Sequence, residues 1–157
     1  MKVRDFLLKK KDESKGQRDF SVSSITYNKF LRPIIDEFRK YNVEMTEIIF
    51  FSIQTSARNR KKGFRDVNSH NDKKRDASGE PPKAIFSIAN LEPRKMEFLL
   101  SVMVYLYGEE SIFDYKEMIK NLEDLAEEGL EIIYNKYEDE YIMSPSKFID
   151  DIFNGKV

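Results

Sequence analysis

The sequence predicts a mainly α-helical protein: a compact bundle of four to five helices that carries a long basic loop. Two observations support this fold class. Apolar side chains recur at helical spacing in several segments, and proline or glycine stands where these segments begin or end. The chain also contains no cysteine, which excludes a disulfide framework, a zinc ribbon and thiol catalysis. A chain of 157 residues fits one domain, so we expect residues 1–157 to form a single helical domain.

The first helix is expected at about residues 26–41. Residues 1–24 have no sustained apolar pattern and are expected to be loosely ordered. A single apolar stripe then begins, made of Tyr27, Phe30, Leu31, Ile34, Ile35, Phe38 and Tyr41. Pro33 lies inside this stripe, so the helix either starts near Arg32 or bends at Pro33.

Residues 47–54 and 83–89 are short apolar segments that suit either a buried helix or a buried strand. For the first, Thr46 is a suitable N-cap and no helix breaker follows before Arg60, which favours a helix. The second stays open. The alternative fold is therefore α+β, with a two-stranded ribbon made from 47–54 and 83–89. Between them, residues 61–82 contain almost no apolar side chains and are expected to form a mobile basic loop.

Three helices are expected in the C-terminal half. Pro93 and Gly108 delimit one at 93–107, which is apolar on nearly every side and is therefore expected in the centre of the bundle. The longest, at about 111–138, has a heptad-like stripe made of Tyr115, Ile119, Leu122, Ala126, Gly129, Ile133 and Tyr137. Ser144 and Pro145 introduce the last helix, at 145–154. Its apolar face consists of Phe148, Ile149, Ile152 and Phe153.

The basic segment Arg58–Arg75 is the strongest local feature. It contains eight Lys and Arg residues against two Asp residues, in a chain whose formal net charge is −1. Clustered cations bind the phosphates of a polyanion, and one aromatic ring can stack on a base. The predicted nucleic-acid contacts are Arg58, Arg60, Lys61, Lys62, Phe64, Arg65, Lys73, Lys74 and Arg75. The alternative is a solvated loop that keeps the protein soluble.

The long helix and the connection after it are acidic: from Glu109 onward the chain contains fourteen Asp and Glu residues but only five Lys and Arg residues. We expect an exposed acidic face here, followed by a half-exposed aromatic connection. The predicted partner contacts are Glu127, Glu128, Glu131, Tyr137, Tyr141 and Met143. The alternative is a solvent-facing surface whose charge offsets the basic half of the molecule.

Catalytic and ligand-binding signatures are weak. His70 is the only histidine, it lies in the basic segment, and the carboxylates lack metal-site spacing, so we expect no enzyme, cofactor or metal. Six aromatic residues could line a ligand pocket, although their spacing is more typical of core: Phe50, Phe51, Phe86, Phe98, Tyr105 and Tyr107. No apolar run is long enough for a membrane span or a signal peptide, so we expect a cytoplasmic protein.

Two functional hypotheses follow. The first is a non-catalytic nucleic-acid-associated accessory or regulatory protein, of the kind that bacterial or phage systems use, which contacts DNA or RNA phosphates through its basic segment. The second is a protein–protein interaction module, a subunit or inhibitor. Such a module would bind a partner protein, or a second copy of itself, through the acidic C-terminal helix.

Overall fold

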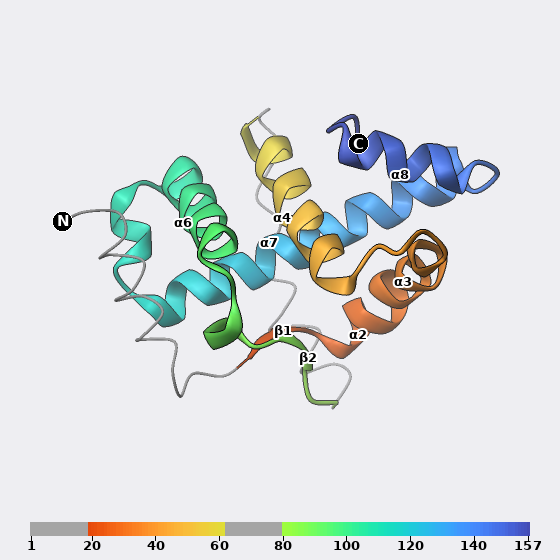
Figure 1. Ribbon diagram of the computed structural model, residues 1–157. Helices are drawn as coiled ribbons and strands as arrows, with labels where there is room; N and C mark the ends of the chain where they lie inside the picture. Colours follow the sequence, from red (N-terminus) through yellow and green to blue (C-terminus); the bar gives the residue numbers. More distant parts are fainter. Residues whose placement is uncertain (1–18, 62–79) are drawn as a thin grey trace.

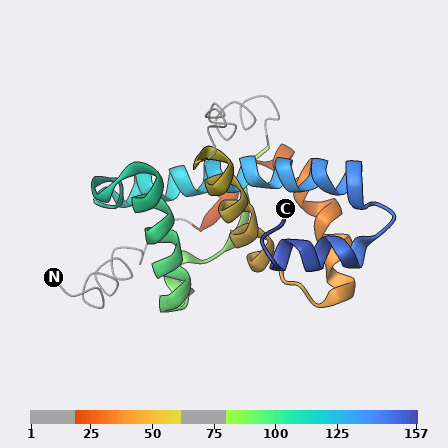
Figure 2. The same cartoon turned by 90° about the horizontal axis from the view of Figure 1, so that it is seen from above.

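Helices pack around one long central helix in the computed structural model, which describes residues 19–61 and 80–157. The central helix is α7 (Tyr115–Lys136), which runs through the middle of the molecule (Figure 1). α6 (Pro93–Tyr107) lies at the N-terminal end of α7, whereas α3 (Arg32–Phe38) and α8 (Pro145–Phe153) lie along its C-terminal half (Figure 2). The predicted mainly α fold class is confirmed.

The expected central position of the 93–107 helix is wrong. α6 has the predicted bounds, and Leu99 and Met103 on its inner face are fully buried. Its outer face carries Glu97, Ser101 and Tyr105, four residues apart, and Tyr105 is 61% exposed. One side of α6 therefore faces solvent, and the stripe of α7, buried from Tyr115 to Tyr137, forms the middle of the core.

α4 (Met45–Lys61) crosses α7 at close range. A Cβ atom on Gly129 of α7 would overlap the carbonyl group of Ser52, so only glycine lets the two backbones approach this closely. Ser52 is buried here, and its hydroxyl donates to the carbonyl oxygen of Ile48 at 2.7 Å. Residues 47–54 are thus helical, as predicted, and the alternative in which they form a strand is wrong. The prediction of Thr46 as the N-cap is wrong, because α4 already begins at Met45 and the N–H of Glu44 donates to the side chain of Glu47 at 3.2 Å.

The first helical segment runs from Ser24 to Tyr41 and changes from an α-helix to a π-helix before Pro33. It consists of α2 (Ser24–Thr26), the π-helix η1 (Tyr27–Leu31), α3 and the 3₁₀-helix η2 (Arg39–Tyr41). The N–H of Arg32 donates to the carbonyl oxygen of Tyr27, which gives the wider π turn. Because proline cannot donate and crowds the preceding turn, this widening lets the helix continue past Pro33.

A two-stranded antiparallel ribbon pairs β1 (Phe20–Val22) with β2 (Lys83–Phe86). For residues 83–89, where the sequence favours neither helix nor strand, the structure has a strand over the first half, followed by the 3₁₀-helix η3 (Ile88–Asn90). The partner strand lies in the range expected to be loosely ordered. Phe20 is fully buried and its ring stacks on that of Phe86 at 4.8 Å, which fixes this strand. Residues 1–18 and most of the expected 61–82 loop lie outside the described residues.

The remaining helices begin and end close to the predicted residues. Gly108 ends α6 with φ +89°, a conformation that favours glycine, and the 3₁₀-helix η4 (Glu109–Ile112) leads to α7. α7 continues into the π-helix η5 (Tyr137–Tyr141), and Ser144 then precedes α8. Within the described ranges, no helix is both long and apolar enough to span a membrane.

Candidate functional site

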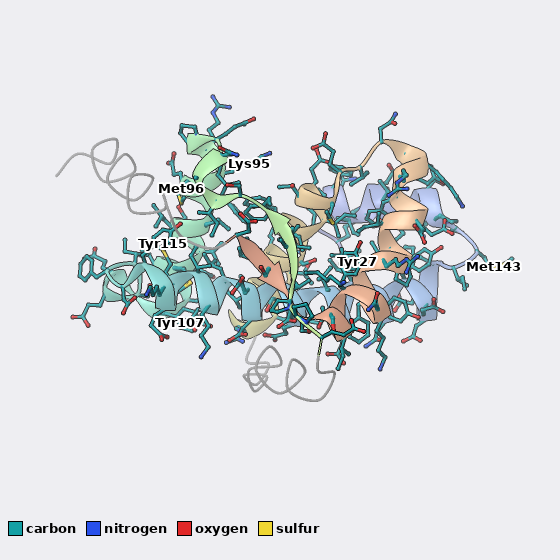
Figure 3. All side chains as sticks on the ribbon, turned by 90° about the horizontal axis from the view of Figure 1, so that it is seen from below. Tyr27, Lys95, Met96, Tyr107, Tyr115 and Met143 are labelled. Atoms are coloured by element: carbon teal, nitrogen blue, oxygen red, sulfur yellow. The ribbon has the colours of Figure 1, made fainter. Side chains whose placement is uncertain are left out.

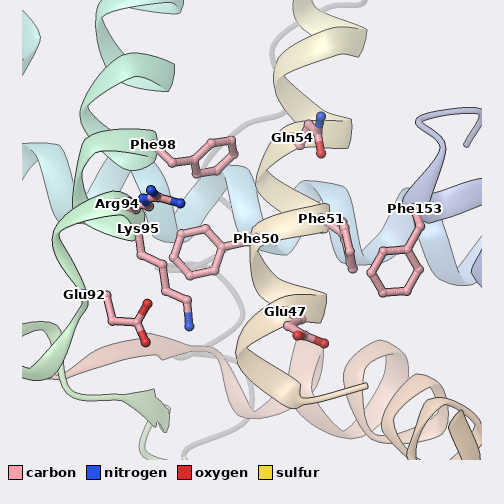
Figure 4. Close-up of a pocket in the computed structure, with 9 residues that line it drawn as sticks. All are labelled: Glu47, Phe50, Phe51, Gln54, Glu92, Arg94, Lys95, Phe98 and Phe153. Carbon is pink, nitrogen blue, oxygen red and sulfur yellow. The ribbon is translucent and has the colours of Figure 1, made fainter. Parts of the chain in front are cut away.

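An open groove of about 350 Å³ lies between the facing sides of α4 and α6 (Figure 4). Four phenylalanine side chains form its apolar surface: Phe50 and Phe51 of α4, Phe98 of α6 and Phe153 at the end of α8. The Phe50 and Phe98 ring centroids are 5.5 Å apart, and those of Phe51 and Phe153 are 4.8 Å apart. Phe153 is nevertheless 54% exposed, and the other three are only partly buried. We call this surface the aromatic groove.

Local sequence spacing explains why these side chains share one surface. Glu47, Phe50, Phe51 and Gln54 follow the i, i+3, i+4, i+7 pattern and therefore lie on one face of α4. On α6, Lys95 and Phe98 are three residues apart and point to the same side. The Phe50 ring also lies 6.1 Å from that of Phe86, so the groove rests on the β-ribbon.

Charged and polar side chains border the aromatic groove: Glu47 and Gln54 on α4, and Glu92, Arg94 and Lys95 at the start of α6. Arg94 and Lys95 stand in the first turn of α6, where the positive end of the helix dipole disfavours cations. Within residues 19–61 and 80–157, neither side chain forms an ion pair. The arrangement can therefore hold apolar side chains that are flanked by carboxylates.

Arg58 and Arg60, the first two predicted nucleic-acid contacts, bind within the protein. The guanidinium of Arg58 donates to the main-chain oxygens of Gly155 at 2.8 Å and Val157 at 2.7 Å. Arg60 donates through Nε and Nη2 to Oε2 of Glu128, at 3.0 and 2.8 Å. The other predicted contacts of the basic segment, namely the side chain of Lys61 and six further residues, lie outside the described part of the chain. These six are Lys62, Phe64, Arg65, Lys73, Lys74 and Arg75.

The expectation of an exposed acidic face at Glu127 and Glu128 is wrong, since these side chains are 1% and 4% exposed. The reason is the central position of α7, which is covered by α4 on one side and by β1 and α2 on another. Glu128 is neutralised by Arg60, and Oε1 of Glu127 accepts the N–H of Ser23 at 2.7 Å. Glu131 is half-buried.

The carboxylates of Glu123 and Glu127 accept backbone N–H groups at the edge of β1, where a neighbouring strand would otherwise provide the acceptors. Oε2 of Glu123 accepts the N–H of Ser21 at 2.6 Å, as Glu127 does for Ser23. Alternate residues of a strand direct their N–H groups to the same edge about 6.6 Å apart, close to the rise of about 6 Å over four helical residues. The two carboxylates thus satisfy a buried strand edge, while Oε2 of Glu127 is buried and has no hydrogen-bond partner among the described residues.

The connection between η5 and α8 contains the most exposed apolar side chains of the predicted partner surface. Met143 is 90% exposed and Ile142 is 53% exposed; we call this pair the apolar turn. The expected half-exposure of this connection is wrong for Tyr137 and Tyr141, also predicted as contacts, because both pack against Phe148 and are buried, with ring centroids 5.1 and 4.9 Å away. Figure 3 shows Met143 at the tip of the molecule.

The base of the apolar turn is fixed by hydrogen bonds. The N–H of Ser144 donates to the carbonyl oxygen of Tyr141 at 2.7 Å, and the Tyr141 hydroxyl donates to Oδ2 of Asp151 at 2.6 Å. This second bond, together with burial, raises the pKa of Tyr141 to about 12. The turn is therefore presented on a rigid support.

The sequence indicates Phe50, Phe51 and Phe98 as pocket candidates but favours a core role, and both hold: all three pack against the core while they line the groove. Arg94, Lys95 and Phe153 are not among the predicted site residues. The available signal was a pair of cations in a first helical turn, next to an aromatic stripe. No protein-family model, curated protein or solved structure matches this chain. In the described part of the chain, no group of His, Asp or Glu side chains could hold a metal ion.

Proposed function

We propose that this protein is a non-catalytic protein–protein interaction module whose binding surface is the aromatic groove. The observation that carries this proposal is the group of four phenylalanine side chains that line the groove while remaining partly solvent-exposed. Apolar patches rimmed by polar residues are typical of interaction sites, and buried aromatic anchors dominate interface energies. An open groove leaves much of a small ligand in water, so a polypeptide is the better occupant.

Site-specific photocrosslinking tests this function. The chain contains no cysteine, so Gln54→Cys places a photoreactive label only at the exposed rim of the groove. In an extract of the native host, we expect an adduct with one defined protein. The yield of the adduct should fall in the groove variant Arg94→Glu/Lys95→Glu, because the charges at the border are reversed. Lys116→Cys, an exposed position on α7, is the matched label control.

The captured protein must then be purified and measured directly. We expect its affinity for the groove variant to fall by about tenfold or more, which corresponds to about 1.4 kcal/mol. If the two label positions give the same adducts, or if the purified protein binds parent and groove variant equally, the aromatic groove is not the binding surface.

A second candidate function is that of a nucleic-acid-associated accessory protein. It is supported by the distribution of charge: the described residues contain 15 Lys and Arg against 22 Asp and Glu, a net charge of −7, although the whole chain has −1. The remaining 36 residues therefore contribute +6. Because Arg58 and Arg60 bind internally, we propose that the phosphate contacts come from Lys61, Lys62, Arg65 and Lys73–Arg75, with Phe64 for stacking.

A further inference from the structure

We infer that the partner of the aromatic groove is a second copy of this chain, which inserts its apolar turn, Ile142 and Met143. The inference rests on the proposed function and names the occupant of the same site. It joins two solvent-exposed apolar features of the described residues, one concave and one protruding.

The apolar surfaces match in kind. The groove offers four phenylalanine rings, and the turn offers an isoleucine and a methionine whose side chains project into solvent. Methionine sulfur makes favourable contacts with aromatic rings, and its unbranched side chain adapts to irregular gaps. Because hydrogen bonds from Ser144 and Tyr141 already fix the base of the turn, insertion immobilises few additional groups.

The charges next to these apolar surfaces are opposite and similarly placed. On α6, Arg94 and Lys95 precede Phe98 by about one helical turn. On the other surface, the exposed Glu138 and Asp139 precede the apolar turn by about one helical turn. Among the described residues, neither Glu138 nor Asp139 forms an ion pair, whereas Glu140 is held by Lys136 at 2.8 Å. The cationic start of α6 on one copy can therefore attract the two carboxylates on the next.

The acidic side chains of the groove do not block this arrangement. The carboxylate of Glu47 accepts the N–H of Glu44 at 3.2 Å and is directed toward the start of its own helix. Figure 4 shows Glu47 and Glu92 toward one end of the groove and Arg94 beside Phe98. The Lys95 side chain extends toward the same end as Glu92, so an acidic segment that enters beside Arg94 pairs first with Arg94 and avoids both glutamates.

The two surfaces cannot meet within one molecule. Figure 3 places Met143 at one tip, far from Lys95 at the start of α6. The contact between copies is therefore heterologous, so each added copy exposes a new groove and a new turn until a ring closes. A contact made by one turn and one groove is small compared with standard interfaces of about 1,600 Å², so the association should be weak and concentration-dependent.

Sedimentation velocity on complementary variants tests the inference. The turn variant is Met143→Glu, at a 90% exposed position, and the groove variant is Arg94→Glu/Lys95→Glu. We expect the average mass of the parent to rise with concentration, between about 10 μM and 1 mM for an interface of this class. Each variant alone should stay monomeric over the same range. Lys116→Glu, which reverses a charge in the first turn of α7, should behave like the parent.

The mixture of the two variants gives the decisive result. Each pair retains one intact groove and one intact turn, so we expect a 1:1 dimer that does not grow further. A parent that stays monomeric, or a mixture that does not associate, overturns the inference. In either case, a lower yield of the Gln54 adduct with another protein in the groove variant would leave the proposed function standing. Equal capture of that protein by parent and groove variant would remove both.

Discussion

The hydroxyl of Tyr141 illustrates how one residue ties the apolar turn to the body of the protein. Its hydrogen bond to Asp151 is the main cause of the raised pKa of about 12, and burial and the nearby carboxylates add to it. Because the folded state holds this proton more tightly than the unfolded state, the resulting stability is present below about pH 10. It is lost as the pH rises through about 12.

Tyr141→Phe should remove this pH dependence. We expect the absorbance titration of the tyrosines at 295 nm to lose one late-ionising group. The free energy of unfolding should also fall less steeply between about pH 10 and 12. Tyr137, whose pKa is raised by burial first and by neighbouring carboxylates, remains in both proteins and serves as an internal reference. If the lost absorbance instead comes from the tyrosines that ionise near pH 10, with the late-ionising part of the curve unchanged, Tyr141 ionises at an ordinary pH.

The buried glutamates show what residue-level pattern recognition cannot supply. Glu123, Glu127 and Glu128 are indistinguishable in the sequence from a solvated acidic face. Their burial depends on partners far along the chain: Ser21 and Ser23 of the ribbon, and Arg60 at the end of α4. Each partner lies at least 68 residues away, so no local spacing could have indicated it.

At the level of the elements, the crossing of α4 and α7 depends on Gly129. In most helix interiors, replacing glycine by alanine stabilises a protein by about 0.5–1 kcal/mol. Here the added Cβ atom overlaps backbone atoms of Ser52, and no side-chain rotation can relieve that overlap. Gly129→Ala should therefore lower the free energy of unfolding by about 1–3 kcal/mol or more in urea denaturation. Asn135→Ala, an exposed position on the same helix, should change it by less than about 0.5 kcal/mol. A more stable Gly129→Ala variant would refute the close crossing.

The helices were largely predictable because their signals are local. The apolar stripe of α7, the pair Pro93 and Gly108, and Ser144 before α8 all fix element bounds within a few residues. The strand Phe20–Val22 was not predictable, since three residues carry no period and their pairing requires β2 and α7. The candidate site was predictable only in part: the stripe on α4 is local, whereas its meeting with Arg94 and Phe153 is tertiary.

For the whole molecule, the separation of charge limits where a polyanion can bind. The described residues carry a net charge of −7 and repel phosphates on average, so any nucleic-acid affinity should come from the basic segment rather than from the body. The internal bonds of Arg58 and Arg60 also change the choice of variants. Replacing these two residues would remove their hydrogen bonds to Gly155, Val157 and Glu128. A loss of nucleic-acid affinity could then not be distinguished from a loss of folding stability.

A charge-matched pair of variants tests the second candidate function cleanly. In the first, Lys62, Arg65, Lys73, Lys74 and Arg75 are replaced by Gln. In the second, five exposed lysines of the body are replaced in the same way: Lys40, Lys83, Lys116, Lys147 and Lys156.

Fluorescence anisotropy with a short labelled DNA or RNA measures the affinity of each protein. We expect weak binding by the parent at about 50 mM salt. The first variant should bind less tightly, and its slope of log affinity against log salt should be flatter than that of the parent by about 0.7–0.9 for each phosphate that is no longer neutralised. The second should bind nearly as the parent does, because the five lysines that it lacks are spread over an acidic surface.

Equal effects in both variants would indicate diffuse electrostatic attraction without a dedicated binding segment. Absence of binding by the parent at this salt concentration would rule out the second candidate function and leave the proposed interaction through the aromatic groove to be tested by photocrosslinking.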